Sequence, residues 1–124
     1  MAYTVAWERH GAYIRYSDLL DFHDFMDAVL CIHADANYAT IKYVIHDMLG
    51  ASRIDFAAVD MTQLVAHELG ARYTNPHVRP VIVSTDALMQ QMVQVFFEHT
   101  KLEVGLCPSL AEARAWIERS TSVA

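Results

Sequence analysis

One short segment, Tyr43-Val44-Ile45, constrains the fold of this chain more than any other. Its residues are β-branched or aromatic, and the chain then breaks into His46-Asp47 and a loop that contains Gly50. A strand that is buried on both faces of a sheet has a continuous apolar run, whereas a half-exposed strand alternates. The segment therefore predicts a central strand over residues 41–48 of a parallel sheet, with a polar end that faces a candidate site.

Strand and helix patterns alternate along the rest of the chain. A short turn at Gly11 joins the first two strands, and this connection is too short for a parallel crossover. Ser17, Asp55, and Thr85 or Asp86 are the expected helix N-caps, and Ser109 and Glu112 have capping-box spacing. The remaining expected strands are 3–7, 12–16, 79–84 and 101–106, and the expected helices are 18–33, 55–73, 88–97 and one that opens at Pro108. The order β-β-α-β-α-β-α-β-α predicts an α/β fold, in which four helices cover a mixed, mostly parallel five-stranded sheet.

Length and composition exclude several classes of protein. A chain of 124 residues favours a single domain over 1–124, and 54% hydrophobic residues argue against disorder. A net charge of −6 without a basic cluster argues against binding to nucleic acid or to an anionic membrane surface. No apolar stretch approaches the roughly 20 residues of a membrane span, and no signal peptide is visible. We therefore expect a cytoplasmic protein in which Cys31 and Cys107 are reduced, mostly buried thiols.

The pattern resembles the STAS fold, in its SpoIIAA-like branch, over nearly the whole chain. The resemblance is carried by Lys42–Asp47, by the helix around Asp60–Tyr73 that leads to Asn75-Pro76, by Val81–Ser84 and by the ending Leu110–Ile117. It implies a SpoIIAA-like domain that resembles anti-sigma-factor antagonists in fold. The ending is similar to that of small uncharacterised bacterial members.

The same resemblance bears on a phosphorylation switch. In anti-sigma antagonists an Asp-Ser-Ser-like segment stands at the helix start that follows the central strand, and one of its serines is phosphorylated by a partner kinase. The matching segment here is Ile54-Asp55-Phe56-Ala57-Ala58, in which Phe56 and Ala57 replace the hydroxyl residues. Ser52 lies before Asp55, and the role is not transferred to it. The resemblance therefore implies a fold relative that lacks the phosphoacceptor.

Candidate catalytic chemistry is confined to His46 and Asp47, at the carboxyl end of the expected central strand. Open α/β sheets place their ligand sites at that end, where a histidine can act as a base. Adjacent residues of a strand point to opposite faces, however, so a polar strand end without catalysis is the simpler interpretation. A small enzyme that uses His46 and Asp47 remains an alternative.

Metal and cofactor motifs are missing from the sequence. The seven histidines contain no i, i+4 pair, the cysteines form no Cys-x-x-Cys, and the glycines form no phosphate-binding loop. We therefore predict no metal, no cofactor and no enzymatic activity.

The expected third helix has an apolar face wider than one stripe, built from Met89, Met92, Val93, Phe96 and Phe97. Such a face is either core, a homodimer face or a groove for an apolar ligand. The leading hypothesis is a non-enzymatic cytoplasmic binding or regulatory module, a homodimer that acts through protein–protein contacts. The second is a carrier or sensor of lipid-like molecules, because the branch is similar to lipid-binding Sec14-type folds. The expected binding residues around the central strand and the next helix start are His46, Asp47, Ser52, Asp55 and Phe56.

Overall fold

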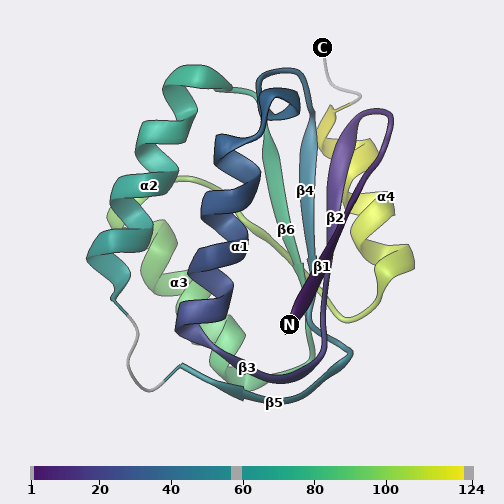
Figure 1. The fold of residues 1–124 in the computed structure, drawn as a ribbon, viewed down its shortest axis with the longest axis vertical. Helices are drawn as coiled ribbons and strands as arrows, with labels where there is room; N and C mark the ends of the chain where they lie inside the picture. The colour runs from purple at the N-terminus through teal and green to yellow at the C-terminus, as the bar shows by residue number, and fades with distance from the viewer. Residues whose placement is uncertain (1, 57–59, 122–124) are drawn as a thin grey trace.

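A computed structural model describes residues 2–56 and 60–121 of the chain (Figure 1). The strands are β1 (Tyr3–Trp7), β2 (Gly11–Tyr16), β3 (Asp18–Asp21), β4 (Tyr43–Asp47), β5 (Ala51–Asp55), β6 (Arg79–Val83) and β7 (Gly105–Cys107). The helices are α1 (Phe22–Ala34), η1 (Ala36–Ala39, a 3-10 turn), α2 (Met61–Thr74), α3 (Ala87–Thr100) and α4 (Leu110–Thr121).

The main sheet has the strand order β1-β2-β4-β6-β7, in which β1 is antiparallel to β2 and the other neighbours are parallel. The strand β4 lies in the middle, and Ile45 pairs with Tyr13 on one side and Val81 on the other. Ile45 is fully buried, as expected for a strand covered on both faces. The predicted five-stranded, mostly parallel sheet and its central strand are therefore confirmed.

The helices cover the two faces of the sheet unequally. Helices α1, α2 and α3 lie on one side, and α4 lies alone on the other (Figure 1). The larger core, under α1 to α3, contains Tyr16, Phe25 and Met89, whereas the smaller core, under α4, contains Ile45 and Ile117. Successive residues of a strand therefore enter different cores, and this alternation decides where His46 and Asp47 go.

Two strands were not predicted. The segments β3 and β5 pair in parallel as a separate two-stranded sheet, where the sequence predicted the start of one helix and a loop. Asp18 has a left-handed φ of 58°, and residues 18–21 pair with β5 as a strand, so α1 begins only at Phe22. The predicted helix start at residue 18 is therefore wrong.

The helix caps follow from these corrected boundaries. The Asp21 carboxylate accepts a hydrogen bond from the Asp24 amide at 2.8 Å, so the N-cap of α1 is Asp21 rather than Ser17. The Asp60 carboxylate accepts from the Gln63 amide at 3.2 Å, so the N-cap of α2 is Asp60 rather than Asp55.

The second half of the chain agrees more closely with the predictions. Asp86 caps α3 by accepting from the Leu88 amide, and the Ser109 hydroxyl accepts from the Glu112 amide. Lys101 ends α3 with a left-handed φ of 60°, and the last strand is shorter and later than predicted, over Gly105–Cys107 rather than 101–106.

Two further sequence expectations concern the thiols and the membrane. Both cysteines are free, Cys107 is buried, and Cys31 is exposed, contrary to the expectation that it is mostly buried. Within residues 2–56 and 60–121, no helix has the length and apolar character needed to cross a membrane.

Candidate functional site

The candidate site is built around His46, which projects from β4 towards the three-helix side of the sheet. His46 pairs in register with Ile14 of the neighbouring strand, and Tyr16 lies two residues further along that strand, on the same face. The Tyr16 hydroxyl and His46 Nδ1 are 2.9 Å apart, and both residues are buried. The ring of Phe25 in α1 covers the imidazole with a centroid distance of 5.2 Å.

Burial determines the protonation of this pair. Burial raises the pKa of Tyr16 well above its ordinary value, so its phenol stays protonated. Among the described residues, its hydrogen-bond partner is the Nδ1 atom of His46. The direction of this hydrogen bond is set by the tautomer of the imidazole, because either nitrogen of the neutral ring can carry the proton. Burial lowers the pKa of His46 to about 4, which Glu68 opposes and His33 reinforces. At neutral pH His46 is therefore uncharged.

A cavity of about 50 Å³ lies next to this imidazole, between the sheet and helices α1 to α3. Among the residues that the structure describes, His46 and Glu68 are the only ionisable ones that line it, and a smaller cavity of about 10 Å³ shares both of them. The other lining residues of the larger cavity are Phe25, Phe56, Leu64, Pro80, Ile82, Met89, Met92, Val93, Phe96 and Val104.

The cavity brings together residues from both sets that the sequence singled out. His46 and Phe56 come from the region of the central strand, and Met89, Met92, Val93 and Phe96 come from α3. Phe97 does not join them, because it is 42% exposed and its ring lies under the Lys101 ammonium at 5.6 Å.

Sequence reasoning missed Glu68, the second polar residue of the cavity. Its carboxylate Oε1 lies 3.5 Å from His33 Nε2, and the His33 ring packs against Tyr38 at 4.9 Å. Glu68 follows Leu64 by four residues, so both lie on the inward face of α2. That spacing is the only signal in the sequence that points to its position.

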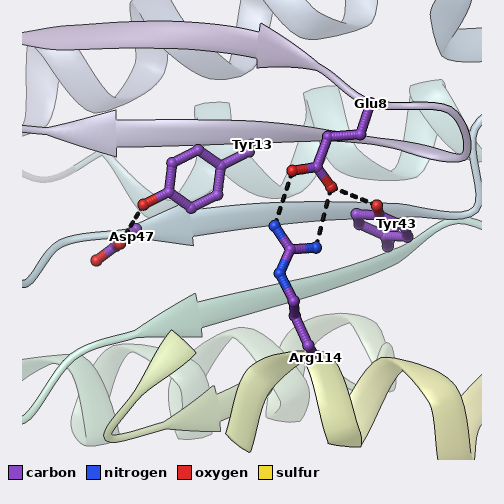
Figure 2. Close-up of polar contacts among 5 residues, drawn as sticks. All are labelled: Glu8, Tyr13, Tyr43, Asp47 and Arg114. Atoms are coloured by element: carbon purple, nitrogen blue, oxygen red, sulfur yellow. Dashed lines mark hydrogen bonds and ion pairs between the residues drawn. The ribbon is translucent and has the colours of Figure 1, made fainter. Parts of the chain in front are cut away.

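Asp47 lies on the opposite face of the sheet from His46. The Tyr13 hydroxyl donates to Asp47 Oδ2 (Figure 2). The Leu49 amide donates to Asp47 Oδ1 at 3.1 Å. Strand alternation separates the two neighbouring side chains. The hypothesis of a catalytic His46–Asp47 pair is therefore wrong for this fold.

The same face carries an ion pair that anchors α4. Arg114 donates to both carboxylate oxygens of Glu8, at 3.0 and 2.7 Å, and Tyr43 donates to Glu8 as well (Figure 2). The hydrogen bonds from Arg114 are the main reason that the pKa of Glu8 is lowered. Because a Cβ at Gly11 would overlap the Tyr43 ring, the glycine makes room for this arrangement. These contacts fix the helix to the sheet rather than form a site.

A second concave region, an open groove of about 480 Å³, runs along α1 towards the start of α2. Phe22, Met26 and Leu30 give it apolar lining. Within the described part of the chain its rim is acidic and includes no lysine or arginine, and the rim residues are Asp21, His23, Asp27, Asp55, Asp60 and Gln63. Asp55, one of the predicted binding residues, thus lies in this groove, and the predicted Ser52 is exposed on β5.

One end of the groove contains a cluster that the search for histidine pairs missed. The ligand atoms of Asp21, His23 and Asp24 lie within 4.8 Å of one another. Asp21 and His23 are exposed, and the Asp21 carboxylate already caps α1. The cluster can offer ligand atoms to a cation, but its geometry is explained by helix capping.

Comparison with known proteins identifies the fold. Neither a protein-family model nor a curated protein matches the sequence. The structure of the anti-sigma factor antagonist SpoIIAA in its unphosphorylated form matches with a TM-score of 0.61 and 16% identity, over 95% of this chain and 98% of that chain. This chain has a SpoIIAA-like fold.

Two further structures support the SpoIIAA-like assignment. The phosphorylated form of the Bacillus cell fate determinant SpoIIAA matches with a TM-score of 0.55 and 16% identity, over 94% of this chain and 99% of that chain. An uncharacterised DUF3478-family protein from Shewanella loihica PV-4 with a SpoIIAA-like fold matches with a TM-score of 0.53 and 13% identity, over 94% of this chain and 92% of that chain. The fold that the sequence resemblance implied is therefore confirmed.

The prediction that the phosphoacceptor is missing assumed that a helix begins at Asp55, and the structure places the start of that helix further along the chain. In this SpoIIAA-like chain α2 begins at Met61, Phe56 is buried against the cavity, and Ala57 and Ala58 lie outside the described residues. The first turn of α2 carries an exposed threonine, Thr62. The placement of the helix start at Asp55 is wrong, and the absence of a phosphoacceptor stays a prediction.

Proposed function

We propose that this chain is a non-enzymatic cytoplasmic module that regulates a protein partner by binding it. The likeness to an anti-sigma factor antagonist along nearly the full length of both chains supports a regulatory role. That protein is described in both phosphorylated and unphosphorylated forms. The separation of His46 from Asp47 removes the catalytic pair that would have favoured an enzyme.

We expect the partner to bind in the acidic groove along α1. Asp21, Asp27, Asp55 and Asp60 surround an apolar lining, and Asp55 is also paired with Arg53 at 3.2 Å. A partner segment with lysine or arginine residues around an apolar side chain complements both features, because opposite charges steer association and the apolar contact excludes water. The partner is therefore expected to present a basic, amphipathic segment.

Removal of groove charge should weaken partner binding. We expect Asp27→Asn combined with Asp60→Asn, in which asparagine can still cap α2, to weaken retention of the partner from a lysate of the source organism by at least about tenfold, as expected for the loss of close charge pairs. Asparagine at residue 27 keeps an acceptor for the Tyr3 hydroxyl, which lies 2.6 Å from the Asp27 carboxylate. The measurement is quantitative mass spectrometry of proteins held by the immobilised chain.

The matched control is Glu98→Gln with Glu103→Gln, which removes the same charge from exposed residues outside the groove. It should retain the partner as the wild type does. Equal loss in both double variants, or no effect in either, would contradict the groove as the docking surface.

We further propose a homodimer, supported by exposed apolar side chains on two adjacent helices. Leu69 and Tyr73 on α2 are 40% and 94% exposed, and Val95 and Phe97 on α3 are 37% and 42% exposed. Light scattering coupled to size-exclusion chromatography should give twice the 14.0 kDa chain mass at tens of micromolar. Phe97→Glu should shift the mass towards the monomer, and a monomeric wild type would reject the homodimer.

The alternative of a lipid carrier receives little support from the cavity. Its volume of about 50 Å³ is a third of the roughly 150 Å³ apolar cavity that accepts benzene. An acyl chain does not fit into this space without separation of the helices that enclose it. Smaller molecules are the only apolar ligands that the arrangement accommodates.

A further inference from the structure

One wall of the acidic groove is a row of side chains along a helix. Phe22, Met26 and Leu30 are spaced four residues apart on α1, so they follow one another on the same side of it. The row spans about 12 Å, because each residue of an α-helix advances the chain by about 1.5 Å. Rows of this kind pack between the side-chain rows of a second helix. This wall therefore has the shape of one half of a helix–helix contact.

The groove offers few main-chain groups to an extended segment. Such a segment gains affinity when its backbone pairs with a free strand edge. Among the described residues that line the groove, Asp21 and Asp55 are the only ones in strands, and each is the last residue of its strand. A helix satisfies its backbone groups internally, so it needs only side-chain contacts from the groove. The lining therefore favours a helix over an extended segment.

Three carboxylates gather at one end of the groove. Asp21 and Asp55 are register partners at the ends of β3 and β5, which lie beside the start of α1 (Figure 1), and Asp60 precedes the first turn of α2. Asp21 and Asp60 cap their helices, and Arg53 pairs with Asp55 at 3.2 Å. A carboxylate has about four acceptor positions, so these contacts leave capacity for a lysine or arginine side chain. Carboxylates that the fold brings together repel one another, and a cation relieves that repulsion.

We propose that the groove binds a basic, amphipathic α-helix of the partner, whose apolar row packs against Phe22, Met26 and Leu30 while its lysine or arginine side chains bind the rim carboxylates. The inference rests on the proposed binding of the partner in this groove and adds the conformation of the bound segment. In a partner sequence such a helix has apolar residues at i, i+3, i+4 and i+7 with basic residues beside them.

The test uses three labelled synthetic peptides of about 15 residues, whose binding is followed by fluorescence anisotropy at nanomolar peptide concentration. The first has leucine at helical spacing and lysine elsewhere, and the second has the same composition rearranged to the alternating pattern of a strand. The third has the helical order with glutamate in place of lysine. The helical lysine peptide should bind the wild type at least about tenfold more tightly than the alternating one, and the glutamate peptide should not bind.

Groove variants locate the binding. Asp27→Asn combined with Asp60→Asn should weaken binding of the helical lysine peptide by at least about tenfold, because both carboxylates belong to the rim. Glu98→Gln combined with Glu103→Gln removes the same charge outside the groove and should leave the affinity unchanged.

The apolar row has its own test and control. Leu30→Ala should weaken binding of the helical lysine peptide by at least about fourfold, the value of one buried methylene group. Leu49→Ala, at an exposed leucine outside the groove, should not change it.

The possible outcomes separate the bound helix from the groove itself. Equal affinity of the two lysine peptides, with both weakened by the groove variant, would overturn the helix and leave the groove as the docking surface. Absence of binding by the helical lysine peptide would also overturn the helix, and retention of the partner from the lysate would then decide on the groove alone. Binding that is unchanged in the groove variant, or equally weakened in both double variants, would contradict the helix and the groove together.

Discussion

Acidification from pH 7 to pH 4 should lower the free energy of unfolding by about 3 kcal/mol through His46 alone. The pKa of this residue falls from 6.5 to about 4 in the folded chain because burial disfavours the charged imidazolium. Each pKa unit corresponds to about 1.4 kcal/mol of difference between the two protonation states. No other histidine of the described chain is as buried as His46.

The sign follows from proton binding. Between pH 6.5 and pH 4 the unfolded chain takes up a proton at His46, whereas the folded chain keeps the ring neutral. The unfolded state is therefore favoured progressively as the pH falls through this window, and the loss is complete below pH 4. Glu68 and His33 are the charged neighbours that modify the effect, Glu68 by opposing it and His33 by adding to it.

Urea denaturation at a series of pH values measures this loss. His46→Phe should reduce the loss between pH 7 and pH 4 by about 3 kcal/mol, although it should be less stable than wild type at pH 7 because the Tyr16 hydroxyl loses its partner. His23→Gln serves as the matched control, because its side chain is 87% exposed. It should show the wild-type loss. An unchanged pH dependence in His46→Phe would show that other groups control acid stability.

The strands of the main sheet were predictable because their signals are local. The run Tyr43-Val44-Ile45 needs two covered faces to be stable, and both faces are covered in the fold. The separation of His46 from Asp47 was predictable for the same reason, since strand alternation requires no knowledge of the neighbours.

The paired strands β3 and β5 were not predictable in the same way. They are four and five residues long and have few fully buried side chains, so no run or alternation marks them. Their stability depends on pairing between segments some thirty residues apart, as in Leu20 with Ile54. Because Asp55 belongs to β5, α2 begins at Met61 rather than at Asp55, where the sequence predicted its start.

The candidate cavity was predictable only in part. The apolar width of α3 pointed to Met89, Met92, Val93 and Phe96, but not to the residues opposite them. Glu68 reaches the cavity because α2 packs beside α3, and its spacing from Leu64 indicates only the inward face of α2, not the helix against which that face packs. The sequence pattern therefore identified the lining residues from α3, whereas those from α1, α2 and the sheet depend on tertiary packing.

Phe25→Ala should lower the free energy of unfolding by about 3–5 kcal/mol, the usual cost of truncating a buried phenylalanine. Phe25 is 5% exposed, and its ring lies 5.2 Å from His46, 5.6 Å from Phe56 and 6.1 Å from Tyr16. The new void joins the existing cavity, so the surrounding side chains cannot close it fully. Because we propose that residues 1–124 form one domain, circular dichroism and tryptophan fluorescence should report a single transition.

Leu49→Ala is the matched control, because Leu49 is 49% exposed and belongs to neither hydrophobic core. It should cost no more than about 0.5 kcal/mol, as is usual for a substitution at the surface. Similar losses in the two variants would contradict the assignment of Phe25 to the core.

Phe25→Ala should also weaken the dependence of the free energy of unfolding on pH. Phe25 covers the imidazole of His46, so its removal admits water to the enlarged cavity and should move the pKa of His46 back towards its ordinary value. The loss of stability between pH 7 and pH 4 should then be smaller in Phe25→Ala than in the wild type. A full wild-type loss in this variant would mean that the strand and α2, rather than Phe25, keep water from His46.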